Sequence, residues 1–171
     1  VVAVLHDAAQ KDLDIVRRSV AKWNPNAPLI EAESVVSLDE KIQLKGKKVL
    51  VVEDGPTLTH GGMKIGAGWV VASRAGAEIV EPLKYAVGSI KATYEKYPHC
   101  AGILPAMGYS AAQIADLNAT VNKVPADLII VGTPIDLRKL LKDDRKMVRV
   151  RYDLKPVRGP KLADFVKKVV G

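Results

Sequence analysis

Short apolar runs recur along this chain, and segments with helical spacing separate them. The clearest run is Lys48–Val52, which has no polar alternation and is typical of a strand covered on both faces. Leu128–Val131 has the same character. Strands that alternate with helices in this way indicate βαβ units. The chain is therefore predicted to be an α/β protein with a mostly parallel, Rossmann-like sheet and helices on both faces.

The same spacing predicts where the individual elements lie. Predicted helices cover residues 12–22, 63–75, 89–97, 110–122, 134–142 and 161–170. Predicted strands cover residues 1–5, 28–32, 48–52, 78–80, 102–104, 128–131 and 147–152. The last strand alternates in character, which is typical of an edge, so antiparallel pairing is expected near the C-terminus. Residues 1–36 hold only two of these strands and one helix, so we interpret them as the tail of another domain.

Charge and cysteine content restrict the class of protein. Residues 1–137 carry 14 Lys and Arg against 15 Asp and Glu, a net charge of −1, whereas residues 138–171 carry 12 against 4, a net charge of +8. A uniformly basic nucleic-acid binder would look different, so nucleic acid is not the expected partner. The basic end is either a solvated face or a contact for an anionic partner. The one cysteine, Cys100, fits a reducing cytoplasm, and no apolar run is long enough to cross a bilayer.

A polar, glycine-rich loop, residues 53–63, follows the strand at 48–52. Ligands of open parallel sheets bind beyond the carboxyl ends of the strands, so this loop is a candidate site. Gly61 and Gly62 allow backbone amides to approach a ligand, and the helix start expected after them favours an anion. The Gly-x4-Gly-Lys-Ser/Thr spacing of a P-loop is absent from the chain.

Three side chains of this loop are suited to chemistry. We expect His60 to carry a proton, Glu53 or Asp54 to take one, and Asp54 to bind Mg²⁺. The alternative is a structural turn that Asp54 caps. The residues expected to contact phosphate here are Thr57, Thr59, Gly61, Gly62 and Lys64.

Further loops follow other predicted strands. In residues 132–138, Thr133 and Arg138 are suited to phosphate, although an ordinary helix cap explains Thr133 equally well. Ser89, in residues 85–89, and the loop at 105–110 are expected to lend a hydroxyl or an amide to the same crevice, or to be turns. No pair of His or Cys residues has the spacing of zinc ligands.

Five segments also resemble a known family: residues 48–63, 85–89, 104–109, 132–138 and 148–152. They are similar to the C-terminal part of cyclic 2,3-diphosphoglycerate synthetase and related predicted GTPases. The resemblance implies a cytoplasmic enzyme that uses Mg²⁺ and ATP or GTP. The named enzyme uses ATP to form an intramolecular phosphoanhydride in 2,3-diphosphoglycerate. It also implies that residues 1–36 are the tail of a P-loop-type domain and that residues 37–171 are the Rossmann-like C-terminal domain.

One departure from the family concerns nucleotide recognition. Where the family carries an Asn-Lys-x-Asp motif, this chain reads Val4-Leu5-His6-Asp7, so only Asp7 is kept. We therefore expect the isolated chain to be inactive.

Our functional hypothesis is a substrate- and phosphate-binding domain of a nucleotide-dependent, ligase-like phosphoryl-transfer enzyme. Its expected partner is a phosphorylated small molecule, with no membrane contact, and a homodimer is left open. The alternatives are a non-catalytic Rossmann-like sensing or interaction domain and the C-terminal part of a GTPase of unknown role.

Overall fold

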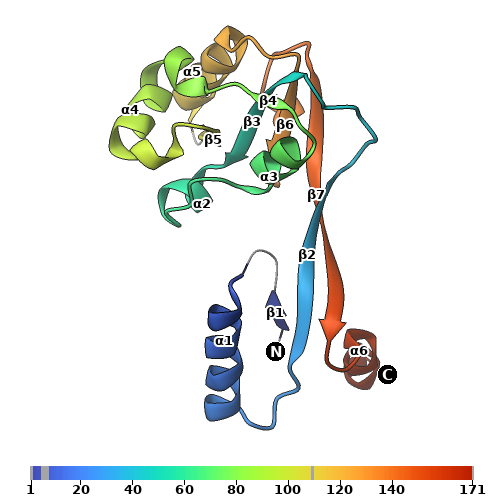
Figure 1. The fold of residues 1–171 in the computed structure, drawn as a ribbon. Helices are drawn as coiled ribbons and strands as arrows, with labels where there is room; N and C mark the ends of the chain where they lie inside the picture. The colour runs from blue at the N-terminus through green and yellow to red at the C-terminus, as the bar shows by residue number, and fades with distance from the viewer. Residues whose placement is uncertain (1, 5–7, 109, 171) are drawn as a thin grey trace. The chain divides into compact units, whose positions relative to one another are not determined.

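The computed structural model describes residues 2–4, 8–108 and 110–170, with side chains for residues 8–108 and 110–167. They form two compact units: a central unit, residues 37–151, and a terminal unit, residues 1–36 with 152–171. Strands β2 (Ile30–Leu38) and β7 (Lys146–Arg158) run from one unit into the other (Figure 1). His6 and Asp7 of the expected base-recognition motif lie outside the described residues. The assignment of residues 1–36 to a P-loop-type domain stays a prediction.

The central unit is built on a parallel sheet. Its strand order is β7, β6 (Leu128–Gly132) and β3 (Lys48–Asp54), and both β4 (Glu78–Ile79) and β5 (Leu104–Ala106) pair with the far edge of β3. Each of these pairs is parallel. The apolar run at 49–52 is fully buried in β3, as its lack of polar alternation predicted.

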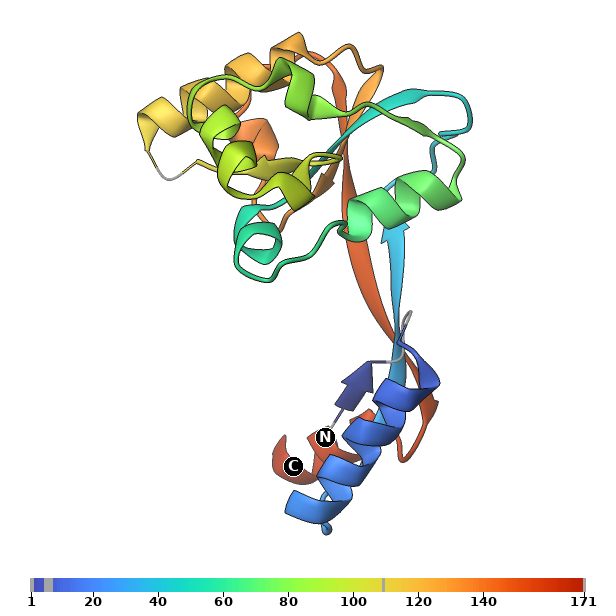
Figure 2. The same ribbon diagram turned by 60° about the vertical axis from the view of Figure 1, so that its left-hand side comes forward.

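Helices cover both faces of this sheet. Helix α3 (Ala67–Arg74) lies on one face, and α4 (Gly88–Lys96) and α5 (Ala111–Lys123) lie on the other (Figure 2). The absence of a side chain on Gly68 brings α3 close to Val51 and Ile130 of the sheet. Ser110 begins α5 with a capping box, its hydroxyl accepting from the Gln113 amide. These features confirm the predicted α/β fold class.

The helix predicted at 63–75 is wrong at its start. The chain instead forms a short helix, α2 (Gly55–Thr59), directly after β3, and α3 begins only at Ala67. Asp54 caps α2 and Pro56 occupies its first turn, which explains the early start. Gly62, at φ +65°, follows the end of α2 in the left-handed region that favours glycine. The predicted end at Gly76 is confirmed, at φ +71°.

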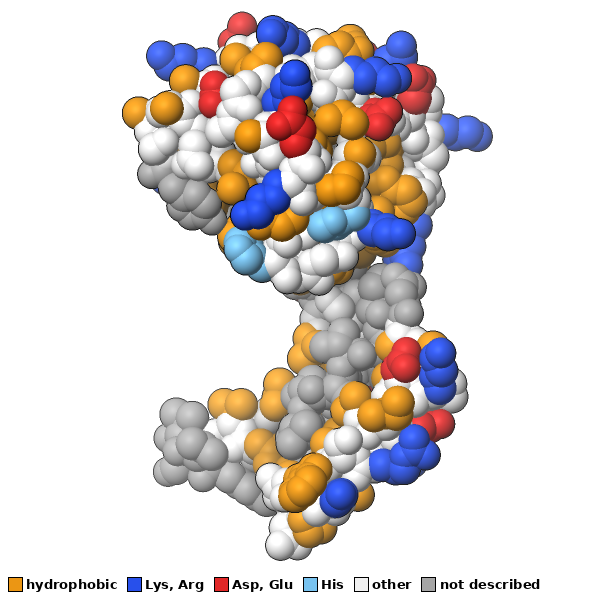
Figure 3. Space-filling view, turned by 90° about the vertical axis from the view of Figure 1, so that its left-hand side faces the viewer, with side chains coloured by type: hydrophobic (Ala, Val, Ile, Leu, Met, Phe, Trp, Pro, Cys, Tyr) orange, Lys and Arg blue, Asp and Glu red, His pale blue; other side chains and the backbone are white. Residues whose placement is uncertain are grey.

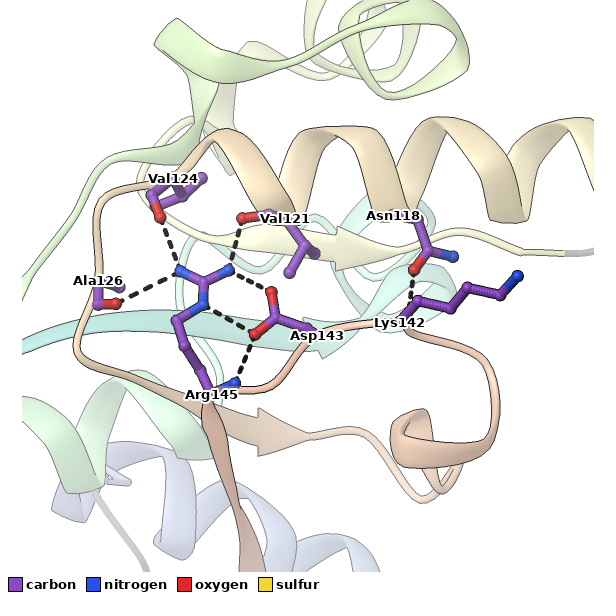
Figure 4. Close-up of polar contacts among 7 residues, drawn as sticks. All are labelled: Asn118, Val121, Val124, Ala126, Lys142, Asp143 and Arg145. Carbon is purple, nitrogen blue, oxygen red and sulfur yellow. Dashed lines mark hydrogen bonds and ion pairs between the residues drawn. The ribbon is translucent and has the colours of Figure 1, made fainter.

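The helix predicted at 134–142 is also wrong, because the chain makes only one 3₁₀ turn, η3 (Leu137–Lys139). Tertiary hydrogen bonds hold the residues that follow. The Asn118 side chain donates to the Leu140 carbonyl and accepts from the Lys142 amide. Arg145 then donates to the carbonyls of Val121 and Val124 at the end of α5, and Asp143 holds its guanidinium (Figure 4). Arg145 thus adds a cationic donor to two carbonyls that also accept from the backbone amides of Val124 and Ala126.

Several strands differ from their predicted positions. Strand β2, predicted at 28–32, covers Ile30–Leu38, and β7, predicted at 147–152, extends to Arg158. Strand β5 begins at Leu104, two residues later than predicted. Strand β7 pairs antiparallel with β2, as expected near the C-terminus, but it is an inner strand because β6 flanks its other side. Two 3₁₀ turns, η1 (Pro82–Tyr85) and η2 (Pro98–Cys100), complete the central unit. Cys100 is buried, and burial raises the pKa of its thiol, so it is a packed residue and not an activated nucleophile.

The terminal unit contains a smaller sheet. Strand β1 (Val2–Val4) pairs in parallel with β2, which pairs with β7, and two helices, α1 (Gln10–Trp23) and α6 (Leu162–Val170), accompany these strands. Arg17 of α1 donates two hydrogen bonds to Glu31 of β2, at 2.6 and 2.7 Å. No helix among the described residues is long and apolar enough to cross a membrane.

Candidate functional site at the carboxyl ends of β3, β5 and β6

Three strands of the central unit end side by side. Glu53 of β3 is in register with Gly132 of β6, and Asp54 is in register with Ala106 of β5. The loops that follow these strands therefore start at one edge of the sheet, as the sequence predicted. This is the edge where ligands of parallel α/β sheets bind.

Glu53 is buried at this edge, with only 3% of its surface exposed. Its Oε1 accepts a hydrogen bond of 3.0 Å from the backbone amide of Trp69, in the first turn of α3. Three glycines make room for the carboxylate. A Cβ at Gly66, Gly68 or Gly132 would lie 2.3, 3.0 or 2.1 Å from the nearest atom of that group. Glu53 thus occupies the start of α3, where a helix favours negative charge.

Burial raises the pKa of Glu53 to about 7, and the amides of Trp69 and Gly68 oppose that rise only in part. The neighbouring Asp54 carboxylate raises it slightly further. A carboxyl group that titrates near neutrality can hold or release a proton under ordinary conditions. Because backbone atoms enclose the carboxyl group, Glu53 can equally well serve only to pack the sheet against α3. The catalytic assignment of Glu53 therefore stays a prediction.

Asp54 faces a small cavity on the other face of the sheet. Its Oδ2 accepts from the Thr57 amide at 3.2 Å and from the Thr57 hydroxyl at 2.7 Å, which confirms that Asp54 caps the turn. The cavity has a volume of about 80 Å³. Apart from Asp54, its wall is mainly apolar and includes Pro56, Met107, Leu117, Ile135 and Leu140. All three loops therefore contribute to one hollow.

Thr59 and His60 form a hydrogen-bonded pair at the end of α2. The buried Thr59 hydroxyl lies 2.9 Å from the Gly55 carbonyl oxygen and 2.9 Å from His60 Nδ1. A carbonyl can only accept, so the single hydroxyl proton goes to Gly55. His60 Nδ1 must then donate, and Nε2 of the neutral, exposed ring carries the lone pair. This arrangement suits a proton acceptor, whereas Thr59 itself is not available to a phosphate.

The predicted anion site at Gly61 and Gly62 does not have the geometry on which it was based. These glycines follow the end of α2 and do not precede a helix, and the Gly61 amide already donates to the Thr57 carbonyl. The end of a helix favours positive charge, not negative. Lys64 is exposed in the same loop. A phosphate contact there would rest on Lys64 and His60 rather than on the glycine amides.

The loop after β6 brings Thr133 and Arg138 to the same edge, but the two residues differ in burial and in hydrogen-bond partners. Thr133 is buried, and its hydroxyl accepts a long hydrogen bond of 3.4 Å from the Ile135 amide. Arg138 is exposed, and its guanidinium donates to both oxygens of Asp136, at 2.8 and 3.2 Å. This contact holds the pKa of Asp136 below its usual range. Arg138 would have to leave Asp136, or share it, to bind a phosphate.

Ser89 does not contribute to the same group of contacts. Its amide and its hydroxyl both donate to Asp116 Oδ2, each at 2.8 Å, and these bonds lower the pKa of Asp116. A Cβ at the neighbouring Gly88 would collide with that carboxylate. Ser89 therefore links α4 to α5, and its expected role in ligand binding stays a prediction.

The metal assignment rests on Asp54 alone. Across the described residues, no group of three His, Cys, Asp or Glu side chains could hold a metal ion. Mg²⁺ often binds one or two carboxylates together with substrate phosphates. Asp54 fits such a role only as a single protein ligand, so Mg²⁺ binding stays a prediction.

Sequence reasoning missed the apolar wall of the cavity. Met107, Ile135 and Leu140 carry no chemical signal, and they meet only because three loops converge. Nothing in the sequence showed that the group lying against the backbone of Gly66 and Gly68 is Glu53. Nothing in the sequence linked Gly132 to Glu53 before the register of β3 and β6 was known.

Comparison with known proteins gives one informative relative. No protein-family model matches the chain. Over 162 residues it is 52% identical to arginine synthetase ArcE of Thermococcus kodakarensis, an alignment that takes in 94% of this chain and 36% of that protein. The chain is therefore related to a synthetase, and it spans about a third of that relative's length. A specific relation to cyclic 2,3-diphosphoglycerate synthetase is not shown.

Proposed function

We propose that the central unit is the substrate-binding part of a ligase-like synthetase, with its substrate at the carboxyl ends of β3, β5 and β6. The observation that carries this proposal is the cavity in which Asp54 adjoins an apolar wall from three converging loops. Such a hollow suits a ligand with an aliphatic part and a cationic end. The name of the T. kodakarensis relative links that protein to arginine, which has both features.

Asp54 is the residue that we assign to the cationic end. A carboxylate and a guanidinium form strong, charge-assisted hydrogen bonds, often as a bidentate pair. The contacts that Asp54 makes with Thr57 use Oδ2, so Oδ1 can turn to a ligand. The apolar wall, including Met107 and Ile135, would pack against the methylene groups of the ligand. His60 Nε2 is our candidate for the proton acceptor.

A phosphorylated substrate is the second candidate. It is favoured by the exposed Lys64 and His60 in the loop after α2, and by the resemblance to cyclic 2,3-diphosphoglycerate synthetase. In that case a nucleotide and Mg²⁺ would supply the phosphoryl chemistry, and this unit would position the acceptor. The alternative of a non-catalytic sensing domain is less well supported, because the relative is a synthetase.

Calorimetric titration of the whole chain with arginine and with 2,3-diphosphoglycerate separates these candidates. Asp54→Asn keeps a side chain that caps α2 equally well but removes the charge. We expect it to weaken arginine binding at least about tenfold, or 1.4 kcal/mol. Glu78→Gln, an exposed carboxylate on β4, is the matched control and should leave binding unchanged.

Three outcomes are informative. Arginine binding that depends on Asp54 but not on Glu78 supports the first candidate. Binding of 2,3-diphosphoglycerate that is lost in Lys64→Gln supports the second. Arginine binding that is the same in Asp54→Asn and wild type contradicts the assignment of Asp54.

A further inference from the structure

The proposed function leaves the basic stretch at residues 138–151 without a role. This stretch holds seven Lys and Arg against two Asp. Three of its cations, Arg138, Arg145 and Lys146, already form ion pairs with carboxylates. Arg149 and Arg151, in contrast, form no ion pair with the described residues. Both belong to the segment 148–152, one of the five that carry the family resemblance. These two arginines are therefore basic groups that still need a partner.

Net charge alone does not locate an anion site in the central unit. Figure 3 shows Lys and Arg side chains dispersed among acidic and hydrophobic ones on the face of this unit that it presents. An anion site therefore has to be identified from its hydrogen-bond donors and from the space beside them.

Arg149 lies at the edge of the sheet that holds the candidate site. It is in register with Val131 of β6, which is in register with Val52 of β3. Side chains in register point to the same face of a sheet, and so do side chains two residues apart along a strand. Arg149 and Arg151 are therefore on the same face as Asp54, which follows Val52 by two residues.

Hydrogen bonds fix the position of Arg149. Its amide donates to Asp39 Oδ1 at 2.9 Å, and its carbonyl accepts from the Asp39 amide, also at 2.9 Å. Its Nη2 donates to the carbonyl of Pro134, in the loop after β6, at 2.9 Å. A guanidinium has five N–H groups. Counting contacts with described residues, Arg149 keeps four of them for a ligand and Arg151 keeps all five.

These donors border a hollow of about 150 Å³, lined by Asp39, Arg149, Val150 and Arg151. Such a volume has room for several water molecules or for an ion of the size of phosphate. The carboxylate of Asp39 lines the same hollow, but its Oδ1 already accepts from the Arg149 amide. The hollow thus combines free guanidinium donors with a carboxylate that is already hydrogen-bonded.

A third guanidinium lies nearby but is not available. Arg138 lowers the pKa of Asp136 through its hydrogen bonds, and the charge of Arg149 lowers it further, so both arginines are near this carboxylate. Arg138 was the residue that the sequence assigned to phosphate, yet Asp136 holds its guanidinium at 2.8 and 3.2 Å. Arg149 and Arg151 are better placed for that role because no carboxylate among the described residues holds their guanidinium groups.

We propose that Arg149 and Arg151 bind the phosphate group of a small phosphorylated ligand in the hollow that they line. Guanidinium groups bind phosphate through paired, charge-assisted hydrogen bonds. A phosphate dianion can accept from two guanidiniums at once, whereas a carboxylate has one charge and two oxygens to share between them. The proposal does not depend on arginine binding at Asp54. It places phosphate beside β7 and not at Lys64 and His60.

The test follows binding of inorganic pyrophosphate to the whole chain by NMR of the arginine Nε–H signals. We expect the signals of Arg149 and Arg151 to shift and that of Arg18, exposed on α1, to stay in place. Arg151→Gln should raise the dissociation constant at least about tenfold, because it removes a charge-assisted donor. Arg18→Gln makes the same change of charge and should leave the dissociation constant unchanged.

Further variants separate binding from folding. Arg151 is exposed, so Arg151→Gln should keep the melting temperature of the wild type. Arg149→Lys keeps the charge but should also weaken binding, since an ammonium cannot reproduce the planar fork. Asp54→Asn should leave pyrophosphate binding unchanged, so that failure of this proposal can be distinguished from failure of the proposed arginine site.

The outcomes decide both the site and its ligand. Pyrophosphate binding that is unchanged in Arg151→Gln, or that is lost in Lys64→Gln instead, would overturn the proposal. Acetate that binds as tightly as pyrophosphate would overturn the assignment to phosphate. Titrations with ADP and with 2,3-diphosphoglycerate distinguish the source of the phosphate group: tighter binding of ADP than of pyrophosphate supports a nucleotide, and tighter binding of 2,3-diphosphoglycerate supports a phosphorylated acid.

Discussion

The carboxylate of Glu53 lies directly against the backbone of Gly132, so that a Cβ at position 132 would be 2.1 Å from Glu53 Oε2. The two residues are in register on neighbouring strands, and neither can move far without disturbing the centre of the sheet. Position 132 requires glycine because a larger side chain would collide with Glu53. Backbone conformation is not the reason, because Gly132 is not in the left-handed region.

Gly132→Ala should therefore destabilise the protein. We expect the free energy of unfolding to fall by about 1–3 kcal/mol, the usual cost of overfilling a packed site. Gly102→Ala is the matched control, because a Cβ there would meet nothing within 4 Å. Urea denaturation of both variants measures the difference. In a Glu53→Ala background the cost of Gly132→Ala should shrink, and an unchanged cost would show that the carboxylate is not the obstacle.

The pH dependence of stability should also report Glu53. Its folded pKa of about 7 lies above the reference value of 4.5, so the folded state binds the proton more tightly than the unfolded state. The free energy of unfolding should then fall as pH rises from about 4.5 to 7 and stay level above that range. The full effect is on the order of 3 kcal/mol. Glu53→Gln, which cannot ionise, should lose this slope in urea titrations at several pH values.

The predictable parts of this fold are local in sequence. The apolar run of β3 and the helical spacing after residue 110 identified a buried strand and a helix start correctly. The late start of α3 depends on Asp54 and Pro56 forming α2 first, a competition that helical spacing does not record. The turn at Leu137–Lys139 depends on Asn118, about twenty residues earlier in the chain, whose hydrogen bonds replace those of a helix.

The candidate site also has a part that the sequence predicted and a part that it did not. Sequence reasoning placed Asp54, Thr133 and the loop at 105–110 at one edge of the sheet because parallel strands end together. It did not show that Arg138 is held by Asp136 or that Thr59 is occupied by Gly55 and His60. Those contacts depend on rotamers and short-range geometry, which residue types alone do not specify.

The pair formed by Thr59 and His60 gives a prediction about the imidazole tautomer. Because the Thr59 hydroxyl donates to Gly55, neutral His60 should carry its proton on Nδ1. Thr59→Val removes the acceptor, so the ring should shift towards the Nε2–H form, whereas Thr59→Ser should keep Nδ1–H. Nitrogen-15 chemical shifts of the ring, measured by NMR at a pH where the ring is neutral, distinguish the two forms. Identical shifts in Thr59→Val and wild type would contradict the assignment.

Arg145 gives the last prediction, because one guanidinium holds the end of α5. It donates to the carbonyls of Val121 and Val124, each at 2.7 Å, and its side chain is 20% exposed. Arg145→Ala should lower the free energy of unfolding by about 2–4 kcal/mol, since it removes charge-assisted hydrogen bonds to these carbonyls and leaves the carboxylate of Asp143, 5% exposed, without its cationic partner. Arg145→Lys should recover little, because an ammonium cannot reproduce the planar fork. The matched control is Arg138→Ala, which removes an exposed pair with Asp136 and should cost much less than Arg145→Ala. Thermal and urea denaturation measure all three variants. Equal losses for Arg145→Ala and Arg138→Ala would show that the contacts at the end of α5 do not stabilise the fold.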